Sequence, residues 1–236
     1  MKKLFHYSFF FILLIATNYG YGQENIVVND SIDTKYREDQ FYIGVNYNVL
    51  LNKPGDARTR GLSGGIHFGY LRDMPINKQR NVALALGLGL SFDEYGQTVF
   101  IGETLQDKSI YTVLDDDDVA YDRNRFSMST IEIPFQLRWR SSTAETYKFW
   151  RIYAGVRLGY TYWYKAAFKQ PGNNVNQTDI SEFNRMRLGA SFSFGYNTVN
   201  FYAHYAITPL FTGAVTTNGE SVDMTPLKLG LIFYIL

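Results

Sequence analysis

The sequence has 236 residues, a formal net charge of +1, no cysteine, and an aromatic fraction of 17% in which tyrosine and phenylalanine dominate. This length suits one domain, or one barrel with sizeable loops, and the near-neutral charge argues against a nucleic-acid partner, which normally shows as a basic excess. The lack of cysteine excludes disulfides and thiolate metal sites.

The first 22 residues have the pattern of a secretory signal peptide: a basic start, an apolar stretch at 9–16, and small residues that suit cleavage before Gln23. The apolar stretch is too short for the roughly 20 residues that a membrane-spanning helix needs. No cysteine follows it, so we expect no lipoprotein anchor. Residues 23–39 are polar and aperiodic, which predicts a short periplasmic lead before a barrel over 40–236.

From residue 41 onward, apolar and polar residues alternate with a period of two in one run after another. In the clearest run, 130–140, isoleucine, phenylalanine, leucine and tryptophan at odd positions oppose mainly threonine, glutamate, glutamine and arginine at even ones. A helix cannot give this pattern, because its faces repeat every 3.6 residues. We expect strands, each near the length of a tilted membrane strand, at 41–49, 61–70, 82–93, 130–140, 150–162, 185–195, 200–208 and 226–236.

The chemistry of the two faces favours a membrane barrel over a soluble one. The apolar face is large and aromatic-rich, whereas the other face mixes small residues with charged and amide side chains, which suits a narrow lumen. The last run would leave an aggregation-prone edge in a soluble domain, but in a membrane barrel it pairs with the first run. The sequence therefore predicts an all-β fold, an eight-stranded antiparallel up-and-down transmembrane β-barrel.

The connector lengths predict the orientation of this barrel. Short periplasmic turns and longer outer loops are the usual asymmetry, and they place both termini in the periplasm. The short connectors are 73–78, 141–147 and 197–198, and the long ones are 52–58, 96–125, 169–182 and 212–222. Pro134 removes a ladder donor inside the 130–140 run, so we also expect a bulge or bend there.

Two strands carry a resemblance to a known family. The run from Thr130 to Trp139, TIEIPFQLRW, resembles the "hxEhPhxhrh" strand of the PorT-like outer-membrane β-barrel family of Bacteroidota. The run from Tyr153 to Tyr160 is similar to that family's "YhhhGhxhG" strand, with Gly155 arriving early. The resemblance implies a porin-like barrel; some members are similar to components of the type IX secretion machinery. It implies no catalytic residues.

The inward face carries a set of charged residues that we interpret as one lumen network. If the turn after Ser141 is centred near residues 144 and 145, Glu132 lies opposite Arg157, and such opposite charges stabilise a sheet pair. Arg138 then lies opposite Arg151. The main interpretation is a structural network that plugs the barrel; the alternative is an anion-attracting vestibule, which needs a wider lumen than eight strands usually leave. The candidates are Glu132, Arg138, Arg151, Arg157, Arg185, Arg187 and Lys228, with Asp93 and Arg140 on the same face.

Two further groups of residues could carry chemistry. Asp115, Asp116, Asp117 and Asp118 in the longest loop form either a solvated acidic run or a weak site for divalent cations that bridge lipopolysaccharide phosphates. His67 and His204 fall on inward faces, away from the lipid-facing rim where an enzyme that modifies lipid A would need them. We expect no cofactor and no dedicated metal site.

These patterns lead to three functional hypotheses for a protein of the bacterial outer membrane. The first is a structural or interaction barrel of the cell envelope, with a possible accessory role in protein secretion. The second is a narrow porin for small solutes, and the third, given least weight, is a lipid A-modifying enzyme. The expected partners are outer-membrane lipid and lipopolysaccharide and an envelope or secretion-complex protein, with no nucleic acid.

Overall fold

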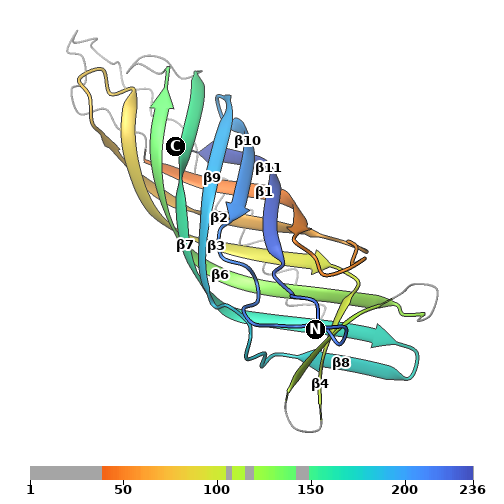
Figure 1. Ribbon diagram of the computed structural model, residues 1–236. Coiled ribbons are helices and arrows are strands. Elements are labelled where there is room, and N and C mark those ends of the chain that lie inside the picture. The colour runs from red at the N-terminus through yellow and green to blue at the C-terminus, as the bar shows by residue number, and fades with distance from the viewer. Residues whose placement is uncertain (1–38, 105–107, 115–119, 142–148, 236) are drawn as a thin grey trace, which may run out of the picture. The chain divides into compact units, whose positions relative to one another are not determined.

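The computed structural model describes residues 39–104, 108–114, 120–141 and 149–235, and in these ranges every regular element is a β-strand (Figure 1). No helix in this part of the chain is long and apolar enough to cross a membrane. The strands are β1 (Gln40–Leu51), β2 (Gly64–Pro75), β3 (Val82–Gly96), β4 (Val99–Glu103), β5 (Ser109–Val113), β6 (Arg123–Arg140), β7 (Trp150–Gln170), β8 (Asn173–Gln177), β9 (Met186–Tyr196), β10 (Val199–Ala206) and β11 (Thr225–Ile235).

Eight of these strands form a closed antiparallel barrel. Around the barrel the order is β1, β2, β3, β6, β7, β9, β10 and β11, and each strand pairs with the next along the chain. The pairing of β1 with β11, from Phe41↔Ile235 to Leu51↔Thr225, closes the cylinder. This confirms the predicted fold: closure leaves no unpaired edge in the barrel, which is the condition for a sheet to cross lipid.

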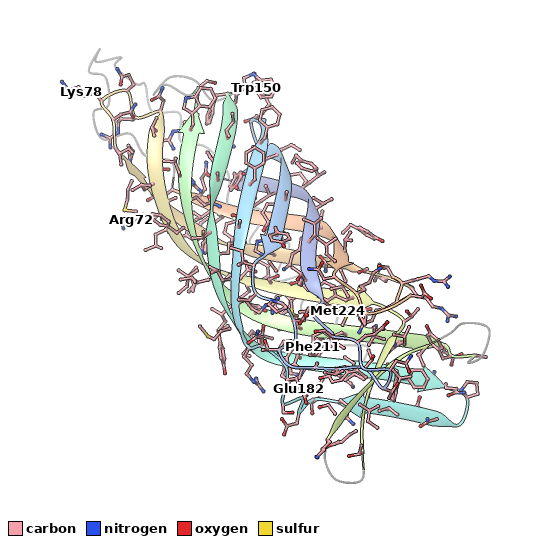
Figure 2. The ribbon with its side chains drawn as sticks, in the orientation of Figure 1. Arg72, Lys78, Trp150, Glu182, Phe211 and Met224 are labelled. Atoms are coloured by element: carbon pink, nitrogen blue, oxygen red, sulfur yellow. The ribbon has the colours of Figure 1, made fainter. Side chains whose placement is uncertain are left out.

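The two ends of the barrel differ in the length of their connections. At the short-turn end, β2–β3, β6–β7 and β9–β10 are joined by brief links, and β1 begins and β11 ends there. At the long-loop end lie the connections β1–β2, β3–β6, β7–β9 and β10–β11, together with β4, β5 and β8. In Figure 2, Lys78 and Trp150 mark the first end, and Phe211 and Glu182 lie toward the second.

Side chains alternate between the outside and the inside of the barrel as predicted. On β6, Ile131, Ile133, Phe135, Leu137 and Trp139 are 40–52% exposed, whereas the intervening Glu132, Gln136 and Arg138 are buried. A continuous apolar belt of this size would favour aggregation in water. In a bilayer the same belt is solvated by lipid.

The strand boundaries differ from the sequence prediction at several places. β2 starts at Gly64 and continues to Pro75, so the link to β3 follows Pro75 and Asp73 lies in the strand. β6 and β7 extend far past the predicted ends. The predictions for 1–22 and 23–38 lie outside the described residues.

Of the bulge or bend predicted at Pro134, the bulge is wrong. The β3–β6 ladder runs Leu86↔Phe135 and then Gly89↔Glu132, so pairing lapses opposite Pro134 without a change of register. Proline lacks the amide donor that the ladder needs, and this alone accounts for the lapse. The register shift occurs instead between β6 and β7, where Thr130 pairs with Thr161 but Ser129 pairs with Trp163, leaving Tyr162 as the extra residue.

Candidate functional site: the filled lumen and its aromatic plug

The centre of the lumen holds an ion pair between neighbouring strands. Arg157 on β7 donates from Nη1 to Oε2 of Glu132 on β6 at 2.6 Å. The register is two residues away from the one predicted, because Arg157 lies opposite Pro134; the ion pair therefore crosses the ladder diagonally. The Arg157 guanidinium also lies 5.3 Å and 5.2 Å from the ring centroids of Tyr42 and Tyr202, so aromatic faces surround the charge.

A second pair connects β11 with β3 across the lumen. Lys228 Nζ on β11 donates to Oδ2 of Asp93 at 2.6 Å and to Oγ of Ser91 at 3.1 Å. Asp93 also accepts a hydrogen bond from Ser91 and one from Asn48 Nδ2. The Asp93 carboxylate is therefore satisfied by three side chains, as a buried charge requires.

A third group lies toward the short-turn end and brings two arginines onto one carboxylate. Asp73 Oδ1 accepts from Arg138 Nη1 at 3.3 Å, and Asp73 Oδ2 lies 2.9 Å from Arg140 Nη1, with all three side chains fully buried. The sequence prediction placed Asp73 in the turn and missed its role as the counter-ion. Arg138 further stacks over Tyr153, 4.6 Å from the ring centroid. These seven residues, Asp73, Asp93, Glu132, Arg138, Arg140, Arg157 and Lys228, are called the polar layer below.

The remaining candidate arginines lie at the margins of the polar layer. Arg151 lies opposite Arg140, not opposite Arg138 as predicted, and it donates to the Asn197 carbonyl. Arg187 is half-buried and donates to the Pro209 carbonyl at 2.8 Å. Arg185 precedes β9 and is exposed, so it does not belong to the network.

The two histidines are packed into the lumen against glycines. His67 Nδ1 lies 3.1 Å from Asn46 Oδ1, and its ring centroid is 4.6 Å from that of Tyr202. A Cβ on Gly44 would overlap the His67 ring, and one on Gly189 would overlap His204, so glycine is what admits each imidazole. Among the described residues no group of three or more His, Asp or Glu could hold a metal ion.

Very little space remains between these side chains. The cavity at the centre of the lumen, lined by Glu132, Arg157, Arg187, His204 and Lys228 among others, has a volume of about 20 Å³. This is room for about one water molecule. Among the described residues, the side chains of the polar layer therefore leave little free volume at this level of the barrel.

Beyond the polar layer the interior becomes aromatic. We call Tyr111, Phe126, Tyr164, Phe183 and Phe211 the aromatic plug. Phe183 lies 4.2 Å from Tyr164, 5.3 Å from Phe126 and 5.9 Å from Phe211 between ring centroids, and Tyr111 lies 5.5 Å from Phe211. Three loop connections that are distant in sequence thus meet over the mouth of the barrel through aromatic contacts.

Backbone and side-chain hydrogen bonds fasten these loops to one another. Phe183 forms an isolated β-bridge with Phe211, and Tyr111 forms one with Thr216. The Tyr111 hydroxyl donates to Glu182 Oε2 at 3.1 Å. Burial, together with the Glu182 carboxylate, raises the pKa of Tyr111. Burial alone would raise the pKa of Glu182, but hydrogen bonds from Ser109 and the backbone outweigh it and lower that pKa.

The signal that the sequence offered for this plug was weak. Phe183 and Phe211 stand in aperiodic stretches, and nothing in their spacing indicates that they meet. Asp115, Asp116, Asp117 and Asp118, the predicted acidic loop, lie outside the described residues.

Comparison with known proteins agrees with this architecture. A family model described as "Outer membrane protein beta-barrel domain" matches residues 22–212. No curated protein sequence matches the chain.

Proposed function

The chain belongs to the outer membrane protein beta-barrel domain family and resides in the outer membrane, and from this premise we propose that it has a structural or interaction role in the cell envelope. The role is that of a closed barrel which anchors a folded outer surface. By the usual asymmetry of these barrels, the long-loop end faces the cell exterior and the short-turn end the periplasm.

The filled interior is the observation that carries this proposal. Conduction needs a continuous path of water or polar ligands through the barrel. The polar layer leaves about 20 Å³ at its centre, and the aromatic plug covers the outer mouth. Both features support a barrel that conducts nothing, in preference to a narrow porin for small solutes.

The fastened outer loops support the interaction part of the proposal. The outer loops present a preformed surface, because isolated β-bridges join them to one another and to the barrel at Phe183↔Phe211, Tyr111↔Thr216 and Thr59↔Gln97. Such a surface loses less conformational entropy on binding than mobile loops do. The partner class that we propose is another envelope protein, and the resemblance to PorT-like barrels makes a secretion complex the first one to examine.

We further propose that the protein is not an enzyme. His67 and His204 face the filled lumen, where no lipid substrate reaches them. Lipid A from a deletion strain is expected to have an unchanged profile, and a changed profile that the intact gene restores would reverse this assignment.

Conductance in planar bilayers tests the closed interior. The purified protein is expected to give no steady open channel under conditions where a known porin does so. A steady, concentration-dependent channel from the wild-type barrel would establish the narrow porin instead.

Site-specific photocrosslinking in intact cells tests the interaction role. A crosslinker at the exposed Asn218 on the outer face is expected to capture one defined envelope protein, whereas the same crosslinker at the lipid-facing Leu88 is not. Equal protein capture from both positions, or capture from neither, would contradict an interaction through the outer loops.

A further inference from the structure

Four cationic side chains lie together on the outer wall of the barrel at its long-loop end. They stand on the outward face of the extended part of β6 and β7, where the ladder runs Ser127↔Lys165, Arg125↔Ala167 and Arg123↔Lys169. Arg123 and Lys169 are exposed, and Arg125 and Lys165 are half-buried. Three consecutive cross-strand pairs thus concentrate positive charge on one surface.

The bulge at Tyr162 is what turns these lysines outward. Before the bulge along β7, even-numbered residues such as Tyr160 face outward. After the bulge, the odd-numbered Trp163, Lys165 and Lys169 face outward, and Tyr164 is buried in the aromatic plug. Without the extra residue, the alternation along β7 would place Lys165 inside. The bulge at Tyr162 therefore orients Tyr164 into the aromatic plug and the two lysines onto the outer surface.

The cations begin where the apolar belt ends. Tyr160, Tyr162 and Trp163 are exposed at the rim of the belt, as aromatic residues are at the interface of a membrane. Lys165 is the next outward residue after Trp163, about 7 Å further along the strand. With the long-loop end facing the cell exterior, as proposed above, this height corresponds to the lipid headgroups of the outer leaflet.

A groove accompanies the charges. It has a volume of about 460 Å³ and is lined by Arg123, Arg125, Lys165 and Lys169 together with Trp163, Ala167, Asn174 and Asn176. Its size is that of a small-ligand site. The two asparagines come from β8 and add amide donors to the cationic wall.

One of the four cations is already neutralised. Arg125 Nη1 lies 2.9 Å and 3.1 Å from the two carboxylate oxygens of Glu94. Within the described residues, Arg123, Lys165 and Lys169 make no ion pair. Three of the four cations of the groove therefore have no carboxylate partner in the part of the chain that the structure describes.

We propose that this basic groove binds the phosphate groups of the anionic glycolipid of the outer leaflet, with the acyl chains lying on the adjacent apolar belt. Arginine and lysine are the side chains that bind phosphate oxygens most strongly, and the tryptophan at the groove's lower edge suits the boundary between acyl chain and headgroup. The site does not depend on the interaction role proposed above, because it lies on the lipid-facing wall and not on the loops.

Binding of purified phosphorylated lipid A to the protein in detergent micelles, followed by native mass spectrometry, tests the proposal. The double variant Arg123→Gln/Lys165→Gln is expected to bind roughly ten- to thirtyfold more weakly. The matched control Arg72→Gln/Lys78→Gln removes one arginine and one lysine from exposed positions at the short-turn end (Figure 2) and is expected to leave binding unchanged. Heat-dependent gel mobility verifies that each variant is folded.

Three outcomes would overturn the assignment. They are equal weakening by the control pair, equal affinity for dephosphorylated lipid A, and full displacement by inorganic phosphate at matched concentration, which would indicate a site for a free anion. A gain-of-function variant provides a second test. Glu94→Gln releases Arg125 and is expected to tighten lipid A binding severalfold, so weaker binding by this variant would also refute the proposal.

Discussion

Mutation of the Glu132–Arg157 pair tests whether water reaches the charged side chains in the lumen. Glu132→Gln keeps the volume of the side chain but removes its charge, leaving the Arg157 guanidinium buried without a counter-ion. The two side chains are 9% and 2% exposed and 2.6 Å apart. Breaking a buried pair of this kind costs about 3–5 kcal/mol, because the remaining charge is desolvated and uncompensated.

A pair of the same chemistry on the outer wall supplies the control. Glu94 and Arg125 are 2.9 Å apart but 27% and 34% exposed. Exposed pairs contribute about 0.2–1 kcal/mol, so Glu94→Gln is expected to change the free energy of unfolding by no more than that. The difference between the two variants isolates the effect of burial.

Urea unfolding in lipid vesicles, followed by tryptophan fluorescence, gives the free energies of unfolding. The double variant Glu132→Leu/Arg157→Met is expected to recover most of the loss, since an apolar replacement of both partners is often neutral. If Glu132→Gln costs no more than Glu94→Gln, then water reaches Arg157 and the argument for a filled, non-conducting lumen fails.

Three further predictions concern the aromatic plug and the lumen packing. Burial and the Glu182 carboxylate raise the pKa of Tyr111, so the stabilisation of the docked loops by Tyr111 is present below about pH 10 and is lost as the pH rises above that value. Protease cleavage of the outer loops should therefore increase above this pH, and Tyr111→Phe should abolish the pH dependence of cleavage. Phe183→Ala should destabilise the plug by about 3 kcal/mol, measured by urea unfolding, yet give no steady channel in bilayers because the polar layer below is filled separately. Gly44→Ala should cost about 1–3 kcal/mol through overlap with His67, and adding His67→Ala should restore the urea midpoint; no recovery would show that the clash lies elsewhere.

The barrel itself could be predicted from the sequence because lipid imposes a simple rule on it. Every membrane strand must present apolar side chains to lipid, so the 130–140 run shows its two faces directly in the alternation. The same rule identifies β11 (Thr225–Ile235) as the closing strand. The inward orientation of Glu132, Arg138 and Arg157 follows from that alternation alone.

The pairing within the lumen could not be predicted in the same way. Asp73 lies near the end of β2, and Pro75 with the polar residues after it indicates that strand end only approximately. A shift of two residues in the β6–β7 register changed every predicted cross-strand partner without changing which side chains face inward. Whether a side chain faces inward depends on whether its position in the strand is odd or even, whereas its cross-strand partner depends on the length of the turn between the two strands.

The aromatic plug and the bulge depend on tertiary contacts. Phe183, Phe211 and Tyr111 meet from three separate loops, and no local period relates them. The extra residue Tyr162 is indistinguishable in sequence from an ordinary strand residue, and only the pairing with Ser129 and Thr130 reveals it.

The seam between β1 and β11 constrains how the molecule can assemble. Phe41 pairs with Ile235, so the two strands of this ladder lie far apart along the polypeptide. Contacts of such long range slow folding. Until the seam forms, both flanking strands carry bare amides and carbonyls that hydrocarbon cannot satisfy. A biogenesis factor that shields those groups, or a bilayer thin enough to admit water to them, would be needed for the cylinder to mature.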